Sequence, residues 1–370
     1  MNQLERFLAV VRFEEPDIWP LLNVQGLGFI HQAGLDSLHA QGLPEQVRDL
    51  DTWCLFFGQQ AFDRVGGIGT GAPGIRRVRR TEGEYDIEEA ETGAVTRTHR
   101  DNVRKYSMPD FQRYDVRDRE SWIIFRDLIT PTARATEQLD ALEDCYRDRS
   151  RPIAVDGGSS WGHIRNWMGP EAALVALYDQ PDLIHEIMQY KRAQFDEYTA
   201  PVIDRLRPEI VMIWEDFCYN HGMMISPDSF REFCTSYYRQ VVEVSRNAGV
   251  SLIIVDTDGE VSEYLDLSEE LGVNGTWPLE QVCGNDLRTY RASHPDMVLA
   301  GGIEKEAVNA GNGEMIEAEL EKVPALFEQG GYFPMFDHAL QPEVDYQELC
   351  RCMTRLHALA GSDLGYFPRS

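Results

Sequence analysis

Residues 209–216 read EIVMIWED and residues 251–259 read SLIIVDTDG, and these two stretches decide the fold. Each is a short, continuous apolar run that ends in acidic residues and is followed by a helical pattern. The same unit recurs at 152–158 (PIAVDGG), 273–280 (VNGTWPLE), 297–305 (MVLAGGIEK) and 331–338 (GYFPMFDH). Apolar runs of strand length that alternate with helices are typical of a parallel sheet buried on both faces.

The number of these units predicts how the sheet is arranged. Six follow residue 150, and residues 18–26 (IWPLLNVQG) supply a further strand near the start. This count favours a closed (β/α)8 TIM barrel, an α/β fold, over an open doubly wound sheet. Neither GxGxxG after the first strand nor GxxxxGK[ST] occurs, which argues against the dinucleotide-binding and P-loop folds. We therefore predict one barrel domain over residues 1–370, with helices at 27–41 and 44–63 in its N-terminal part.

Residues 76–100 interrupt this rhythm. The stretch is charged, rich in Thr and Val, and turns at Glu91-Thr92-Gly93. These features predict an antiparallel hairpin or small sheet that faces solvent. No low-complexity linker follows it, so we interpret it as an insertion into the barrel domain.

Composition excludes several classes of partner. The chain has 35 basic and 62 acidic residues, a net charge of −27, which disfavours nucleic acid and anionic membrane surfaces. No apolar run approaches the 18 or so residues of a membrane span, and the start does not resemble a signal peptide, so we expect a cytoplasmic protein. The seven scattered cysteines contain no CxxC pair and predict neither a disulfide framework nor a zinc ribbon.

Acidic residues stand at the end of every predicted strand after residue 150. Active sites of TIM barrels lie at the carboxyl ends of the strands. A single Asp there could merely cap the next helix, but capping does not call for Glu. Converging carboxylates hold a metal, act as acid and base, or bind a polar or cationic substrate. The acids in question are Asp156, Glu215, Asp216, Asp256, Asp258, Glu280, Glu304 and Asp337.

Five strings together carry a family resemblance: WEDFCYNHGMMISPDSFREF (214–233), IIVDTDG, LGVNGTWPLE, LAGGIEK and GGYFPMFDHALQPEVDY. In this order they resemble the uroporphyrinogen decarboxylase superfamily, and more specifically the branch that holds the cobamide-dependent methyltransferases. The resemblance covers about residues 150–360 and implies a (β/α)8 barrel. The string LIIVDTDGEV alone also resembles the nucleophile motif of haloacid-dehalogenase-like phosphatases, but it lies late in the chain and no GDxxxD string follows it.

Departures from the family pattern indicate a subtype. The decarboxylases carry Arg-Gln-Ala-Gly-Arg near the N-terminus, where this chain has His31-Gln-Ala-Gly-Leu35. The thiol-methylating enzymes hold zinc with a His-x-Cys pair and a later Cys, where this chain has Asp256-Thr-Asp258 and Asp337-His338. The resemblance thus implies an enzyme that demethylates an aryl ether or an amine and passes the methyl to a corrinoid. Because no DxHxxG string occurs, the corrinoid is expected on a separate protein.

This interpretation assigns roles to named residues. The expected catalytic residues, which would also be the ligands of zinc or another divalent cation if one is bound, are Glu215, Asp256, Glu280 and His338. The expected substrate-binding residues are Trp161, His163, Asp258, Trp277, Glu304 and Asp337; core packing is the alternative role of the tryptophans.

Two other functions stay open: a decarboxylase or lyase that acts on a small acid, and a binding protein of the same fold without catalysis. A small molecule and a corrinoid protein are the expected partners, and a homodimer is left open.

Overall fold

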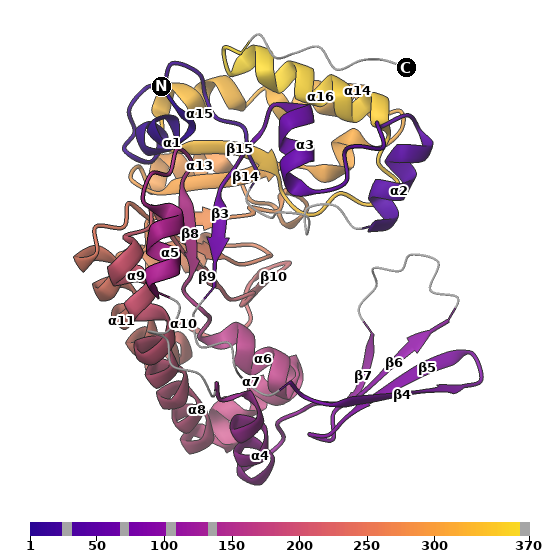
Figure 1. Cartoon of the computed structure of the whole chain (residues 1–370), viewed down its shortest axis with the longest axis vertical. Coiled ribbons are helices and arrows are strands. Elements are labelled where there is room, and N and C mark those ends of the chain that lie inside the picture. The colour runs from indigo at the N-terminus through magenta and orange to yellow at the C-terminus, as the bar shows by residue number, and fades with distance from the viewer. Residues whose placement is uncertain (24–31, 67–73, 101–108, 132–138, 363–370) are drawn as a thin grey trace.

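A seven-stranded parallel sheet forms the centre of the molecule (Figure 1), in the order β15-β14-β13-β12-β9-β8-β3. The computed structural model describes residues 1–23, 32–66, 74–100, 109–131 and 139–362. The strands of the central sheet are β3 (Asp63–Val65), β8 (Ile153–Asp156), β9 (Ile210–Trp214), β12 (Leu252–Asp256), β13 (Gly275–Trp277), β14 (Val298–Ile303) and β15 (Tyr332–Phe336). Each of the six apolar runs predicted as strands after residue 150 contains one of these elements, and the run predicted over 18–26 contains β1 (Leu22–Asn23), with 24–26 outside the described residues.

The N-terminal strands bring the two edges of this sheet together. β1 (Leu22–Asn23) pairs in parallel with β2 (Gln60–Ala61), and the chain runs on through Phe62 into β3. β1 also contacts β15, the strand at the far edge of the central sheet. The strands therefore run round a common axis, and the predicted TIM-barrel-like α/β fold is confirmed.

Helix α1 (Gln3–Val11) closes the barrel at the end where the strands begin. Its Phe7 is fully buried and stacks on Phe333, near the start of β15, with 5.4 Å between the ring centroids. Phe7 and Val10 of α1 belong to the same apolar cluster as the inward-facing residues of the strands. The opposite end of the barrel, where the strands finish, is left for a site.

Helices separate the strands and bury their outer faces in a larger apolar core. The other α-helices are α2 (Gln32–Ala40), α3 (Leu50–Phe57), α4 (Arg119–Ile129), α5 (Leu139–Tyr146), α6 (Trp161–Met168), α7 (Pro170–Asp179), α8 (Pro181–Gln194), α9 (Ala200–Leu206), α10 (Pro227–Ser229), α11 (Thr235–Asn247), α12 (Ser262–Glu270), α13 (Leu287–Ser293), α14 (Gly313–Leu320), α15 (Val323–Gln329) and α16 (Tyr346–Leu359). One turn of π-helix joins α8 to α9 and another joins α10 to α11, so both segments run on as helices, as predicted.

A four-stranded antiparallel sheet projects from the barrel (Figure 1), formed by β4 (Arg77–Glu82), β5 (Tyr85–Ala90), β6 (Val95–His99) and β7 (Asp110–Arg113). Its strands carry arginines paired with acids across the sheet, such as Arg79 with Glu88. The predicted antiparallel excursion is thus present, and it is larger than the 76–100 hairpin. β10 (Cys218–Tyr219) and β11 (Gly222–Met223) form a separate short hairpin.

The structure corrects the predicted helix over 44–63. Only α3 is helical there, because Gly58 adopts a left-handed conformation (φ 64°) that ends the helix. Residues 60–61 and 63–65 then form β2 and β3, a part of the barrel wall that was missed. Of the predicted helix over 27–41, residues 32–40 are α2, and 27–31 lie outside the described residues.

Among the helices that the structure describes, none combines the length and the apolar character needed to cross a membrane. All seven cysteines are free thiols.

Candidate active site at the mouth of the barrel

The alternation of side chains along the strands builds a polar layer above the apolar interior. The inward-facing apolar residues include Phe62, Ala154, Met212 and Ile254. Because side chains alternate along a strand, the residue two positions after each of these also faces the barrel axis. At that level a cavity of about 340 Å³ is lined by Arg64, Asp156, Trp214 and Asp256, together with His163 of α6.

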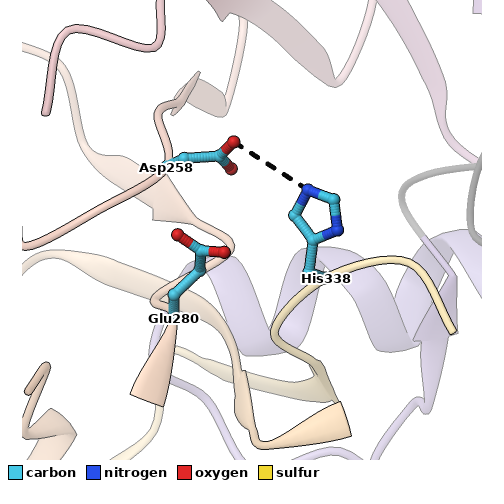
Figure 2. Close-up of side chains that lie close together, drawn as sticks. All are labelled: Asp258, Glu280 and His338. Carbon is cyan, nitrogen blue, oxygen red and sulfur yellow. Dashed lines mark ion pairs between the residues drawn. The ribbon is translucent and has the colours of Figure 1, made fainter. Parts of the chain in front are cut away.

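A group of two carboxylates and one imidazole lies at the strand ends. Asp258, Glu280 and His338 point toward one another (Figure 2), and their potential ligand atoms all lie within 4.8 Å of one another. Oδ2 of Asp258 is 3.9 Å from Nε2 of His338. The three residues follow β12, β13 and β15, so the barrel brings together positions that are far apart in sequence.

Gly259 holds two members of this group in place. Its backbone N–H donates to Oε2 of Glu280 at 2.8 Å, which keeps that carboxylate next to Asp258. The glycine has φ +88°, and a Cβ here would lie 2.5 Å from the backbone nitrogen of Tyr219. Only glycine fits this turn without a shift of the backbone.

A second carboxylate group adjoins the first and shares Asp258 with it. Asp216, Asp256 and Asp258 each offer an oxygen within 4.8 Å of the others. Asp216 has φ 49°, an uncommon conformation for a residue other than glycine, and such outliers are often found at functional sites. Arg165 of α6 pairs with Asp216 at 2.7 Å and offsets part of the negative charge.

Burial and mutual repulsion shift the acids of the site toward the protonated form. Burial, with Asp216 and Glu280 nearby, raises the pKa of Asp258 to about 7, while Arg165 and Lys305 oppose the shift. Burial also raises the pKa of Asp256 well above its usual range, and the charge of Asp216 adds to that effect. Clustered carboxylates with raised pKa values at a strand end are typical of functional sites.

Glu215 lies outside both groups. Its fully buried carboxylate accepts hydrogen bonds from the backbone N–H groups of Ser160, Trp161 and Gly162 at 2.6, 2.7 and 3.0 Å, and from the Ser159 and Ser160 hydroxyls. It thereby caps the first turn of α6 from a neighbouring strand end. Burial raises the pKa of Glu215, and these hydrogen bonds oppose the shift. The expected convergence of Glu215 with Asp256 and Glu280 is not observed.

Asp337 also serves the backbone. It is fully buried, and its two oxygens accept hydrogen bonds from the N–H groups of Gln281 (2.8 Å) and Lys305 (3.0 Å). It therefore ties together the segments that follow β13, β14 and β15. Its neighbour His338, one residue on, faces the mouth instead.

The remaining candidates are divided among several places. Trp161 packs in the core beneath the helices, and Trp277 belongs to the barrel interior. Burial and the carboxylates of Glu319 and Glu306 raise the pKa of Glu304, so this residue lies among acids of the following segment.

His163 does line the cavity, and it has a partner that the sequence did not predict. Nζ of the buried Lys191 lies 2.5 Å from Nδ1 of the ring. When Lys191 is protonated it can only donate, so Nδ1 is then the acceptor and the ring proton lies on Nε2. Burial lowers the pKa of both His163 and Lys191.

The fold and the site thus define a TIM-barrel-like α/β protein whose mouth carries carboxylates, a histidine and an arginine around a small cavity. The uroporphyrinogen decarboxylase (URO-D) family matches residues 110–359, and the chain belongs to this family, as the strings in its sequence indicated.

Among solved structures, the chain is similar to a methyltransferase from Methanosarcina mazei, with a TM-score of 0.58 and 14% sequence identity over 97% of this chain and 98% of that one. At this identity the similarity establishes the fold alone. No curated protein matches the chain significantly in sequence.

Proposed function

We propose that the protein is a methyltransferase component that takes a methyl group from a small methylated ether or amine and passes it to a cobalt(I) corrinoid on a separate protein. The observation that carries this proposal is the group of Asp258, Glu280 and His338 at the barrel mouth, within 4.8 Å of one another. Membership of the family and the fold shared with a methyltransferase support it.

The reaction needs a site that acts on the leaving group. Cobalt(I) attacks the methyl carbon, the bond from carbon to the heteroatom breaks, and its electron pair stays on the heteroatom while cobalt becomes cobalt(III). An ether oxygen leaves only if a proton or a cation neutralises the charge that it gains. A quaternary nitrogen leaves as a neutral amine and needs mainly to be held in place.

The donor set fits a divalent cation such as zinc. Two carboxylates and one imidazole match a catalytic site with three protein ligands and an open position for substrate. When bound, such a cation supplies a Lewis acid for the leaving heteroatom. The chain itself orients Glu280 through the Gly259 N–H. Arg165 offsets the negative charge of Asp216, so that the carboxylates remain close together.

The test is methyl transfer to free cob(I)alamin under anaerobic conditions, with a panel of methylated aryl ethers and amines, together with metal analysis of the purified protein. We expect Asp258→Asn to lower both the metal content and the rate of transfer, the rate on the order of 10²-fold or more. Asp228→Asn is the matched control, because that side chain is 98% exposed outside the site.

Two results would contradict the proposal. Release of CO₂ from a small acid without methyl transfer would favour the alternative function, a decarboxylase or lyase. Failure of every panel member, with no reaction of any kind, would favour a binding protein without catalysis.

A further inference from the structure

Two side chains of opposite charge face the same cavity from different parts of the barrel wall. Arg64 stands on β3 and Asp256 at the end of β12, and both line the cavity of about 340 Å³. In the order of the sheet, β8 and β9 lie between these two strands. The cavity therefore has a basic wall and an acidic wall.

Arg64 is directed inward by the register of its strand. Phe62, two residues earlier, belongs to the barrel interior, so the side chain of Arg64 faces the same way at the mouth. Within the described part of the chain, no carboxylate lies within 4.0 Å of its guanidinium; the polar contact found is Nη2 to Sδ of Met212 at 3.6 Å. A guanidinium presents five N–H donors that suit a carboxylate, and here they are open to a ligand.

Asp256 is in a comparable state on the other wall. Among the residues whose placement is described, none hydrogen-bonds to its carboxylate or forms an ion pair with it, although the residue is half-buried and lines the cavity. Trp214, its partner in the register between β9 and β12, lines the same cavity with an indole ring. A carboxylate beside an aromatic face suits an alkylated ammonium group.

Neither a simple anion nor a simple cation satisfies both walls. An anion on Arg64 would be repelled by Asp156 and Asp256, which line the same cavity. A cation beside Asp256 would be repelled by Arg64, whose exposed guanidinium would gain no acceptor from it. A ligand that carries both charges pairs with both walls.

We propose that the cavity binds a small zwitterion, an N-methylated ammonium carboxylate, whose carboxylate is held by Arg64 and whose methyl-bearing nitrogen faces Asp256 and Trp214. This assignment names the substrate class of the proposed methyltransferase and rests on that function for the fate of the methyl group. Transfer from such a nitrogen moves the methyl to cobalt(I), and the electron pair of the broken bond stays on the nitrogen. The product is a neutral tertiary amine that keeps its carboxylate.

Titration calorimetry with three probe series tests the assignment. The first series is trimethylammonium carboxylates with one to four methylenes between the nitrogen and the carboxylate. The second replaces the carboxylate by an alcohol, and the third replaces the charged nitrogen by carbon, as tert-butyl carboxylates. We expect the wild-type protein to bind one zwitterion at least about tenfold more tightly than its alcohol and its carbon analogue, about 1.4 kcal/mol.

Two variants test the contributions of the basic wall and the acidic wall separately. Arg64→Gln is expected to remove the preference for the zwitterion over the alcohol, and Asp256→Asn the preference over the carbon analogue. Arg239→Gln, on the exposed face of α11, is the control and should leave all three affinities unchanged. Melting temperatures no lower than that of the wild-type protein would show that each variant is folded.

The assignment is overturned if no zwitterion in the series binds, if the alcohols bind as tightly, or if Arg64→Gln weakens both series equally. Failure of the proposed function gives a different result. If a zwitterion binds tightly but its methyl group is not transferred, the methyltransferase function is contradicted and the assignment of a zwitterionic ligand is supported. Methyl transfer from a ligand that lacks one of the two charges would contradict only the assignment.

Discussion

Asp256 stands where β12 ends, and within the described ranges its carboxylate has no hydrogen-bond partner. At the scale of single residues, this makes it a side chain that contributes charge to the mouth of the barrel and little to the fold. Asn has the same shape but lacks the charge. Stability and activity should therefore respond differently to its replacement.

We predict that Asp256→Asn lowers the rate of methyl transfer on the order of 10²-fold or more, because the carboxylate is lost from the acidic wall. The melting temperature should stay the same or rise, since Asp216 and Asp258 no longer repel a third charge. Steady-state kinetics and thermal unfolding measure the two effects. Wild-type turnover in this variant would remove Asp256 from the chemistry.

Lys191 gives a second prediction for a single residue, and it concerns pH. Its ammonium lies over the rings of Trp167 (5.0 Å) and Tyr237 (5.9 Å) in a buried position. Burial lowers the pKa of Lys191 to about 7, although Glu215 and Asp156 oppose the shift, whereas an unfolded chain keeps a lysine pKa of about 10.4. Between these values the unfolded state binds more protons, so the free energy of unfolding rises with pH.

Lys191→Met should remove this contribution. From about pH 7 to about pH 10, the free energy of unfolding of the wild-type protein is expected to gain up to about 3 kcal/mol more than that of the variant. Denaturant titrations at several pH values measure the difference. Parallel pH profiles for the two proteins would mean that Lys191 keeps its ordinary pKa in the folded state.

At the scale of elements, alternation along β9 and β12 explains which of their strand-end acids reach the mouth of the barrel. After β9 and β12 the residues that continue the inward-facing series reach the mouth: Asp216 comes two residues after Trp214, and Asp258 two after Asp256. Glu215 alternates with this series on β9 and bonds to backbone N–H groups instead. Asp337 does not follow the rule, because it comes two residues after the inward-facing Met335 and still bonds to backbone N–H groups. The sequence marked every strand end as acidic. Applying period two past the end of β9 would have separated Glu215 from Asp216, but past the end of β15 it would not have shown that His338, and not Asp337, joins the group at the mouth.

Other features could not be predicted from the local pattern. Lys191 meets His163 across 28 residues because α8 packs against α6, and that depends on tertiary packing. The strand residues 60–65 were hidden because they directly follow a helix and are too short to show a period of their own. The five long apolar runs from residue 209 onward, in contrast, were predictable, since a strand buried on both faces needs continuous apolar sequence.

The cap on α6 leads to a prediction for this element. Glu215→Gln should destabilise the protein by roughly 2–4 kcal/mol, because an amide cannot accept from three backbone N–H groups as a carboxylate does. The neighbouring variant Asp216→Asn is the control and should affect activity more than stability. Chemical denaturation measures both. Full stability of Glu215→Gln together with lost activity would instead support the catalytic role first expected for Glu215.

The turn after β12 gives another prediction. Gly259→Ala should lower the activity at least about tenfold, because the new Cβ meets the backbone of Tyr219 and displaces the N–H that holds Glu280. Gly249→Ala is a matched control: it has a similar φ of +81° but no atom within 4 Å of the added Cβ. That variant should show only the cost of the backbone strain, about 1–2 kcal/mol of stability. Equal effects on activity would mean that the contact at Gly259 is unimportant.

For the whole molecule, the packing of α1 against β15 brings an N-terminal helix and the last strand of the barrel into one apolar core. Phe7 stacks on Phe333, and the two apolar clusters lie on opposite faces of the same strands. We therefore predict a single cooperative unfolding transition, in keeping with one domain over residues 1–370. Tryptophan fluorescence and far-ultraviolet circular dichroism should give the same midpoint; two separate midpoints would indicate independent domains.

The most direct test of the whole account follows the methyl carbons and the carboxylate carbon of one substrate through a single turnover. The trimethylammonium carboxylate that binds most tightly is labelled with ¹³C at its methyl groups and at its carboxylate, and is mixed with the protein and cob(I)alamin without oxygen. Nuclear magnetic resonance is expected to show one labelled methyl on cobalt and the labelled carboxylate still on the product, a dimethylamino carboxylate. Labelled CO₂, with every methyl still on nitrogen, would contradict methyl transfer and indicate decarboxylation.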